Sequence, residues 1–276
     1  MSHYSVAVFT EPDGAGVDEL LAPFNENTEV EPYVSKTRSQ VIEYGRAVID
    51  RDKEEYEKYL ADPEAFARVH LPSNGSYYRK ITEEYPERMK WTDDEVYEWT
   101  IRYYFGDDNV DEDGNVWSTY NPQSKWDWYA YGGRFGGDLI LRLKPEDEEY
   151  DYRDDDGLYY TDDALVSRVD FEEMRKQKMS SIYPYDEFMK RSFYGEEYLK
   201  SRYPNEEMYL KAYTEFTTYA VITPDGEWHA PGEMGWFACS TETPEEASEW
   251  DEKYYERFIE PAIEKGWEIH IVDCHI

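Results

Sequence analysis

The stretch that decides the fold is Thr243–Val272, with the sequence TPEEASEWDEKYYERFIEPAIEKGWEIHIV. Thr243 and Glu246 stand three residues apart, as in a capping box, and Pro244 takes the first helical position, so a helix is predicted to begin here. Along that helix every fourth residue is apolar or aromatic, which forms one stripe: Trp250, Tyr254, Phe258 and Ala262. This spacing predicts a helix that packs with one face on a sheet.

Strands are predicted at both ends of the chain. Trp267–Val272 follows Gly266 as an apolar run of strand length, and Tyr4–Phe9 forms another that stops at the turn Pro12–Gly14. We expect these two strands to pair or to lie within one sheet. A third strand, Thr217–Thr223, is followed by a Pro-Asp-Gly turn and the start of a returning strand.

The remaining segments favour helices and one acidic insertion. Helical spacing of apolar residues runs from Ser35 to about Leu60, a capping box at Thr92 begins another helix, and helices are expected over much of 170–212. Residues 146–163 are nearly all acidic or Tyr, and such dense like charge predicts a flexible loop. Together these patterns predict an α+β fold: a mixed or antiparallel sheet with packed helices and an acidic insertion, in a single domain over 1–276.

A candidate site lies in Lys125–Gly137, KWDWYAYGGRFGG. Aromatic faces offer stacking surface, an arginine offers a planar fork of donors, and glycine permits positive φ. The candidate ligand-binding residues are Lys125, Trp126, Asp127, Trp128, Tyr129, Gly132, Gly133 and Arg134. In one continuous strand, Trp126 and Trp128 would share a face opposite the charged residues. Two interpretations stay open: a structural bend whose aromatics fill the core, or a pocket with charged residues around an aromatic floor.

Two further segments supply candidate residues. In GEMGWF, Glu233 and Trp236 form either a loop that covers the sheet or a second wall of the same site, with Glu233 as an acceptor or general base. In the closing VDCHI, Asp273 and His275 can share one face of a strand, and either can pair with His3 if the first and last strands are neighbours. Anchoring of the chain end is favoured over catalysis. A cysteine nucleophile is disfavoured, because adjacent strand residues point to opposite faces.

The charge is the strongest feature of the composition, since 63 acidic against 29 basic residues give a formal net charge of −34. Such a field repels nucleic acid and anionic membranes and attracts basic partners, so direct nucleic-acid binding is not expected. Three explanations stay open: a solubilising surface, adaptation to high salt, and an acidic face that imitates a polyanion. The 28 Tyr, 9 Trp and 11 Phe weaken the second, because they make the chain aromatic rather than poor in core residues.

No cofactor, metal ion or membrane span is predicted. Cys239 and Cys274 lack metal-binding spacing, and a segment from Asn109 that begins like a calcium loop has Tyr120 where a bidentate Glu is required. Motifs for phosphate-binding loops, zinc proteases and nucleophile elbows do not occur. No apolar run approaches the ~18 residues of a span, and the N-terminal residues do not resemble a signal peptide, so we expect a cytoplasmic location in a host cell.

Several segments, taken together, resemble one family. They are HYSVAVFT (3–10), LLAPFNENTEVEPY (20–33), NPQSKWDWYAYGGRFGG (121–137), VDFEEMR (169–175), GEMGWF (232–237) and VDCHI (272–276). This combination resembles an uncharacterised family of bacteriophages, prophages and other mobile elements, whose central motif reads KWDWYxIGGRW. Tyr131 and Phe135 depart from the Ile and Trp of that motif. The resemblance implies a phage or mobile-element accessory protein and implies no reaction.

These features predict a protein that acts mainly by binding. The expected partner is a basic host or defence protein, which the chain would inhibit as a counter-defence or host-takeover factor through a nucleic-acid-mimicking acidic surface and the aromatic-Arg cleft. The alternative is an enzyme or sequestering protein for a nucleotide-like small molecule in the same cleft. Its base would stack on Trp126 or Trp236, and its phosphate would meet Arg134 and Lys125.

Overall fold

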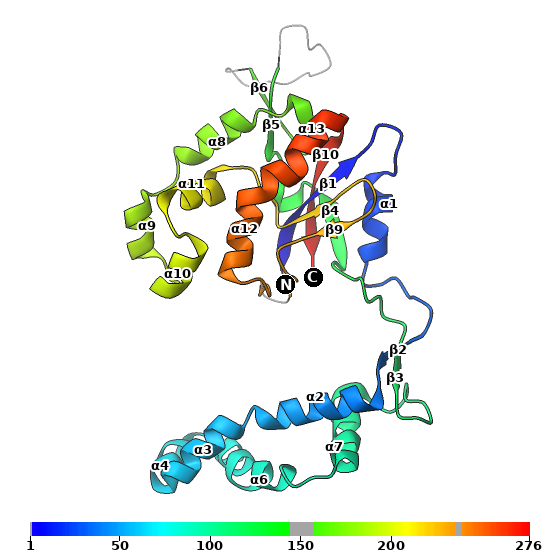
Figure 1. Cartoon of the computed structure of the whole chain (residues 1–276), viewed down its shortest axis with the longest axis vertical. Coiled ribbons are helices and arrows are strands. Elements are labelled where there is room, and N and C mark those ends of the chain that lie inside the picture. The colour runs from blue at the N-terminus through cyan, green and yellow to red at the C-terminus, as the bar shows by residue number, and fades with distance from the viewer. Residues whose placement is uncertain (1, 144–156, 236–238) are drawn as a thin grey trace. The chain divides into compact units, whose positions relative to one another are not determined.

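The computed structural model describes residues 2–143, 157–235 and 239–276. Its contacts divide the chain into two compact units: unit 1 combines Met1–Thr28 with Asn121–Ile276, and unit 2 is Glu29–Tyr120 (Figure 1). This division differs from the single domain over 1–276 that the sequence analysis expects. No clear change of composition marks either boundary, so the sequence pattern gives no signal for it.

Unit 1 is built on a six-stranded sheet. Five strands lie in the order β4, β10, β1, β8 and β9, and β7 pairs with another part of β10. Their bounds are β1 His3–Thr10, β4 Trp128–Tyr131, β7 Asp163–Leu165, β8 Ala220–Ile222, β9 Trp228–His229 and β10 Glu268–His275. β1 and β8 are parallel and the other pairs are antiparallel, so the sheet is mixed and the predicted α+β class is confirmed.

The strands predicted at the two ends of the chain pair with each other. β1 and β10 have eight residues each and are antiparallel over their whole length, from His3 opposite His275 to Thr10 opposite Glu268. β10 also pairs with β4 through Val272–His275 and with β7 through Glu268–His270. The expected pairing of the terminal strands is therefore confirmed. It places the VDCHI segment between His3 and the central motif.

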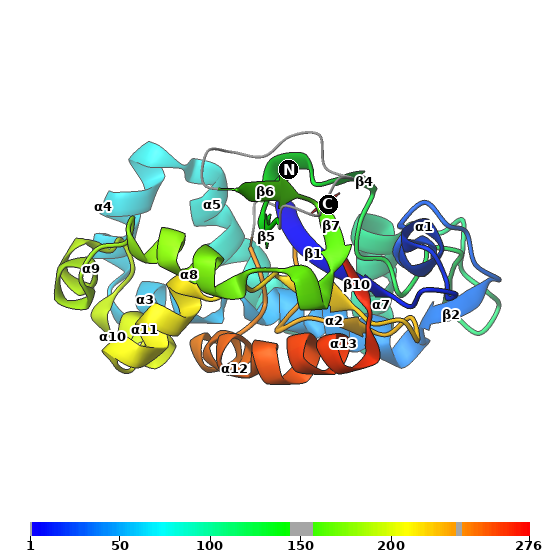
Figure 2. The same cartoon turned by 90° about the horizontal axis from the view of Figure 1, so that it is seen from above.

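One face of the sheet is covered by the predicted C-terminal helix (Figure 2). α12 (Pro244–Tyr254) continues through the π-helical turn η7 (Tyr255–Ile259) into α13 (Glu260–Lys265), and both hydrogen bonds of the capping box at Thr243 are present. The core on this face contains the whole predicted stripe, Trp250, Tyr254, Phe258 and Ala262, together with Ala7, Phe9, Val221, Ile269 and Ile271 of the sheet. The prediction of a helix packed on a sheet is confirmed.

The opposite face of the sheet is covered by α1 (Val17–Leu21) and η1 (Ala22–Phe24). The core on that face contains Val6, Val8, Ala220, Ile222, Val272 and Cys274 of the sheet, with Leu20, Leu21, Phe24 and Trp126 packed against them. Neighbouring residues of β1 and β10 are thus buried on opposite faces. Strands buried on both faces appear in the sequence as continuous apolar runs, as these two do.

Short helices and a hairpin complete unit 1. The helical elements are η4 Gly133–Phe135, η5 Val166–Arg168, α8 Phe171–Met179, α9 Tyr185–Arg191, α10 Glu196–Arg202 and α11 Glu206–Thr214, which confirms helices over much of 170–212. β5 (Leu139–Arg142) pairs with β6 (Leu158–Thr161). The predicted acidic loop at 146–163 is therefore wrong at its end, because Leu158 is buried in the core and starts a strand. Residues 146–156 lie outside the described part of the chain.

Unit 2 is mainly helical. Its elements are β2 Tyr33–Lys36, α2 Arg38–Asp50, α3 Lys53–Ala61, α4 Pro63–Ser73, α5 Gly75–Arg79, η2 Lys80–Glu84, α6 Tyr85–Arg88, α7 Asp93–Thr100, η3 Ile101–Phe105 and β3 Val116–Ser118. The capping box at Thr92 is confirmed. The helix predicted from Ser35 to Leu60 is wrong at its start, because Ser35 lies in β2 and α2 begins only at Arg38. It is also interrupted between Asp50 and Lys53, where the Asp52 carboxylate binds the Lys80 ammonium at 2.8 Å.

The central position of β10 predicts a difference between two isoleucines in the C-terminal segment. Ile271 lies in β10 and is fully buried, whereas Ile263 lies in α13 and is partly exposed. Ile271→Ala should lower the free energy of unfolding by about 2–5 kcal/mol, because it leaves a cavity between sheet and helix, whereas Ile263→Ala should lower it by less than about 1 kcal/mol. Urea denaturation followed by near-ultraviolet circular dichroism measures both, and equal losses would contradict the assigned core.

Candidate functional site

The residues of the central motif do not gather on one face of the sheet. Trp126 is 5% exposed and packs in the core beneath α1, where its Nε1 donates a hydrogen bond to the Leu21 carbonyl at 3.2 Å. The Tyr129 ring contacts that indole edge-on, with 4.9 Å between ring centroids. Trp128, in contrast, lies opposite His275 of β10 and stacks on its imidazole at 4.9 Å. The prediction that Trp126 and Trp128 share a face is therefore wrong.

The expected alternation fails because the strand begins late in the motif. β4 starts only at Trp128, and the backbone N–H of Asp127 donates to the His275 carbonyl at 2.9 Å. The N–H of Trp128 donates to the Asp127 carboxylate at 2.8 Å. An Asp side chain that binds a nearby backbone N–H competes with regular strand pairing. The side chains that precede Trp128 therefore do not follow the alternation of the strand.

Two histidine–aspartate pairs lie at the end of the sheet where the chain termini meet. Nδ1 of His3 is 2.9 Å from Oδ1 of Asp273, and Nδ1 of His275 is 2.6 Å from Oδ1 of Asp127. The two imidazole centroids are 5.0 Å apart, and His275 and Asp273 are both buried. The predicted pairing of His3 with the VDCHI segment is confirmed, through Asp273. These contacts fit the structural interpretation, in which the groups hold the ends of β1 and β10.

Asp273 also holds the glycine-rich bend that follows β4. Its Oδ2 accepts a hydrogen bond from the backbone N–H of Arg134 at 3.0 Å. Gly132 and Gly133 have φ angles of +61° and +56°, and a Cβ on Gly133 would lie 2.5 Å from the Cβ of Asp273. Only glycine adopts this positive φ angle readily and also leaves room for the Asp273 side chain, because it has no Cβ. The Arg134 side chain is exposed, and its guanidinium forms no hydrogen bond or ion pair with a described residue.

Tyr129 and the neighbouring Tyr131 bind an aspartate of α1. Their hydroxyls donate to Oδ1 of Asp18 at 2.6 and 2.7 Å, and these two hydrogen bonds lower the pKa of that carboxyl. Burial, together with the hydrogen bond to Asp18, raises the pKa of Tyr131 to about 12. Both tyrosines therefore remain neutral donors at physiological pH, which suits a structural contact between β4 and α1.

The predicted second wall does lie beside the motif. Nζ of Lys125 is 2.7 and 2.8 Å from the two carboxylate oxygens of Glu233, so the structure brings these two candidates together. They line a cleft of about 670 Å³, with the side chains of Phe24, Trp228 and His229 also in its lining. Trp236, the other candidate of this wall, lies outside the described residues.

This geometry does not favour a nucleotide site in the motif. A base cannot stack on Trp126, since the ring is buried in the core, and the Lys125 ammonium is already bound by Glu233. Burial raises the pKa of the Cys274 thiol, so this cysteine is not a thiolate nucleophile near neutral pH. The motif mainly joins β4, β10 and α1 to one another.

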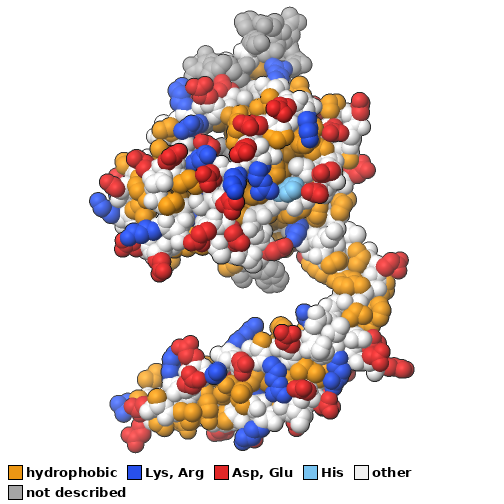
Figure 3. All heavy atoms as spheres, viewed as in Figure 1, with side chains coloured by type: hydrophobic (Ala, Val, Ile, Leu, Met, Phe, Trp, Pro, Cys, Tyr) orange, Lys and Arg blue, Asp and Glu red, His pale blue; other side chains and the backbone are white. Residues whose placement is uncertain are grey.

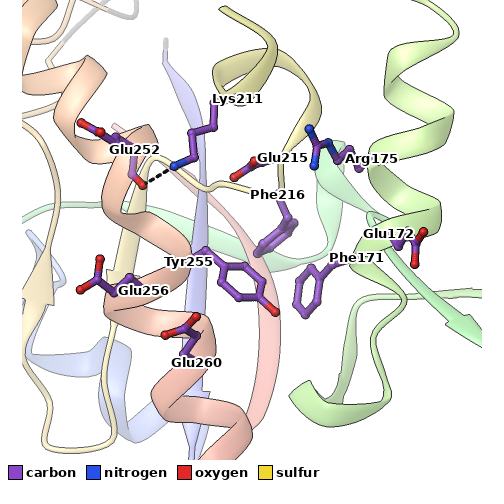
Figure 4. Close-up of a pocket in the computed structure, with 10 residues that line it drawn as sticks. All are labelled: Phe171, Glu172, Arg175, Lys211, Glu215, Phe216, Glu252, Tyr255, Glu256 and Glu260. Atoms are coloured by element: carbon purple, nitrogen blue, oxygen red, sulfur yellow. Dashed lines mark hydrogen bonds between the residues drawn. The ribbon is translucent and has the colours of Figure 1, made fainter. Parts of the chain in front are cut away.

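A different surface of unit 1 combines aromatic rings with acids. A groove of about 450 Å³ is lined by α8, residues 215–216 after α11, and the helix formed by α12, η7 and α13 (Figure 4). The Phe171 ring contacts the two other aromatic rings of the groove, with centroid distances of 5.7 Å to Phe216 and 5.8 Å to Tyr255. The other lining residues are all charged: Glu172, Glu215, Glu252, Glu256, Glu260, Arg175 and Lys211. We refer to these ten residues as the acidic groove.

None of the five carboxylates of the acidic groove forms an ion pair with a described residue, although Arg175 and Lys211 line the same groove and Lys253 interacts electrostatically with Glu252 and Glu256. Nζ of Lys211 donates to the backbone carbonyl of Glu252 at 3.0 Å, not to a carboxylate (Figure 4). Elsewhere on α12 a glutamate does have a partner, since Glu249 binds Lys253. Glutamates of this helix therefore differ: Glu249 has an ion-pair partner, whereas Glu252, Glu256 and Glu260 form no ion pair with a described residue.

The sequence analysis missed this groove although part of the signal is visible. Glu252, Glu256 and Glu260 repeat every fourth residue, offset by two positions from the apolar stripe that was recognised. What the local pattern does not reveal is that Phe171, from a distant segment, contacts both Phe216 and Tyr255 and so completes the lining of the groove.

Comparison of the chain with models of known protein families, with curated proteins and with solved structures finds no significant match. Among the described residues, none of the helices has both the length and the apolar character needed to span a bilayer. In the same part of the chain, no group of three or more His, Cys, Asp or Glu side chains is placed to hold a metal ion.

The contacts around the glycine-rich bend predict a large loss of stability from one charged residue, Asp273, and a small one from another, Arg134. Asp273→Asn should lower the free energy of unfolding by about 1–3 kcal/mol, because it weakens the buried bonds to His3 and to the Arg134 N–H. Arg134→Ala should change it by less than about 0.5 kcal/mol, since that side chain is exposed. Thermal or urea unfolding measures both. An Arg134→Ala protein that is as unstable as Asp273→Asn would show that the guanidinium is structural.

Proposed function

We propose that the protein acts by binding a basic protein partner, and that the acidic groove of unit 1 is where the partner's cations dock. The observation that carries this proposal is the excess of acid in the groove: five glutamates, none in an ion pair with a described residue, line it together with two cations, Arg175 and Lys211. The Tyr255 ring, which is 38% exposed, supplies apolar area that a partner can bury. The proposed activity is therefore recognition, with no reaction assigned.

The spacing of the glutamates on one helix supports the proposal. Glu252, Glu256 and Glu260 are four residues apart, and like charges at this spacing destabilise a helix by about 0.2–0.5 kcal/mol per pair. Four residues of an α-helix make slightly more than one full turn, so side chains at this spacing move gradually around the helix axis. The wider π-helical turn η7 reverses part of this rotation, and the three glutamates therefore stay close to one line along the helix. A bound cation relieves their mutual repulsion, which adds to the affinity of a basic partner.

The charge of the whole chain supports a basic partner as well. With a net charge of −34, the chain attracts basic surfaces over about a Debye length, which raises the rate of association. Acidic side chains are spread over the faces of both units that Figure 3 shows. The partner would therefore present a basic surface, and basic surfaces are typical of proteins that bind nucleic acid. The proposed partner is accordingly a nucleic-acid-binding protein of the host or of a defence system, which the chain inhibits in the cytoplasm by imitating a polyanion.

Removal of the groove charges tests the proposal. Binding of an alternating Lys-Arg dodecapeptide is measured by isothermal titration calorimetry for the full chain and for the triple variant Glu252→Gln, Glu256→Gln and Glu260→Gln. We expect the triple variant to bind roughly tenfold more weakly, because each partly exposed charge pair contributes a few tenths to about 1 kcal/mol. The affinity of the unchanged protein should fall as salt is raised.

The matched control removes three exposed glutamates of unit 2: Glu57, Glu64 and Glu98. This variant has the same net charge as the groove variant, so a general field effect would weaken both equally. We expect the control to keep its affinity within about twofold of the unchanged protein, because its charges do not face the groove. Equal losses in the two variants would overturn the assignment of the groove and leave only the diffuse charge.

A further inference from the structure

Four arginines of this protein share one arrangement with an aromatic ring and a carboxylate. Arg38 lies over the Tyr97 ring at 4.5 Å, and its Nη2 binds Asp94 at 2.6 Å. Arg191 lies over Tyr183 in the same way. The arginine, ring and carboxylate sets are Arg38 with Tyr97 and Asp94, Arg88 with Trp99 and Glu84, Arg191 with Tyr183 and Glu187, and Arg202 with Tyr203 and Asp251. In each set the guanidinium lies over the aromatic ring while its N–H groups bind the carboxylate.

The acidic groove contains a ring and carboxylates, but its own arginine, Arg175, does not lie over the ring of a described residue. Tyr255 is 38% exposed, so one part of its ring is open to a ligand. Among the described residues, no Lys or Arg lies over the rings of Phe171, Phe216 or Tyr255. Arg175 belongs to the α8 wall of the groove and not to its ring cluster (Figure 4).

We propose that the acidic groove binds the side chain of an arginine from the partner, with the guanidinium over the Tyr255 ring and its N–H groups donating to glutamates of the groove. This inference rests on the proposed function and names the chemical group that is recognised. Glu256 and Glu260 lie on the same helix as Tyr255, Glu172 lies on α8 across the groove, and Glu215 lies above the rings between Lys211 and Arg175 (Figure 4). A planar fork of donors can bind a carboxylate through two parallel N–H groups while the guanidinium lies over the ring.

Arginine fits this groove better than lysine for a physical reason. The lysine ammonium is a compact, strongly hydrated point charge, so it loses more hydration when it moves against a ring. The guanidinium is more weakly hydrated, stacks on aromatic faces and has five N–H donors in a fixed geometry. The acidic groove should therefore discriminate between two partners of equal charge.

Two peptides of equal charge, hexa-arginine and hexa-lysine, test the inference at constant ionic strength by isothermal titration calorimetry. We expect the full chain to bind hexa-arginine about tenfold more tightly than hexa-lysine. Tyr255→Leu should bring the two affinities within about twofold by weakening only the arginine peptide, whereas Tyr255→Phe keeps the ring and should keep the preference. As a control, Tyr103→Leu removes an exposed tyrosine of unit 2 and should change neither affinity.

Each outcome of this experiment decides between the two proposals. Equal affinity for the two peptides, or an equal loss for both in Tyr255→Leu, would overturn arginine recognition, and the proposed function would survive if the glutamate triple variant still binds weakly. If neither peptide binds, both proposals fail. If Tyr255→Leu does not fold, as its melting temperature will show, intermolecular nuclear Overhauser effects between the arginine Hδ protons and the Tyr255 ring replace it, and their absence overturns the inference.

Discussion

The pairing of β1 with β10 is the constraint on which unit 1 depends. Eight residues of each strand pair without a break, and this pairing joins the two ends of the chain at the centre of the sheet. Each strand buries side chains on both faces, so α1 and the helix α12–η7–α13 are both required to cover it. The core between the sheet and the helix α12–η7–α13 also contains Phe216, with Phe171 packed against it, and so holds the elements that line the acidic groove.

This constraint explains why the central motif, despite its composition, has a mainly structural role. Its aromatic, acidic and glycine residues fasten β4 to the other side of β10: Trp126 fills the core, Asp127 binds His275, and Gly133 accommodates Asp273. Carboxylates that hold imidazoles and backbone N–H groups are not free to bind a ligand. The side chains that remain available for recognition lie on the helices, where glutamates line a groove that also contains the exposed Tyr255 ring.

The sequence predicts the elements of this fold better than the site. The apolar stripe from Trp250 and the runs at both termini identify the sheet and the helix on it, because burial leaves a periodic pattern in the sequence. Two features have no such pattern. The Asp127 carboxylate accepts a hydrogen bond from the Trp128 N–H, so the side chains before Trp128 do not follow the alternation of the strand. Phe171 contacts Tyr255 only because the tertiary fold brings distant segments together. A local pattern shows which side chains are buried, not which distant ones meet.

The most direct test of this account is to find which amides of the protein respond to a basic ligand. Amide chemical shifts are measured by nuclear magnetic resonance during titration with the alternating Lys-Arg dodecapeptide. The account predicts that the largest shifts occur in α8, in residues 215–216 and in η7, around the acidic groove. Shifts confined to Lys125–Gly137, with the groove unchanged, would contradict it and would return the function to the central motif.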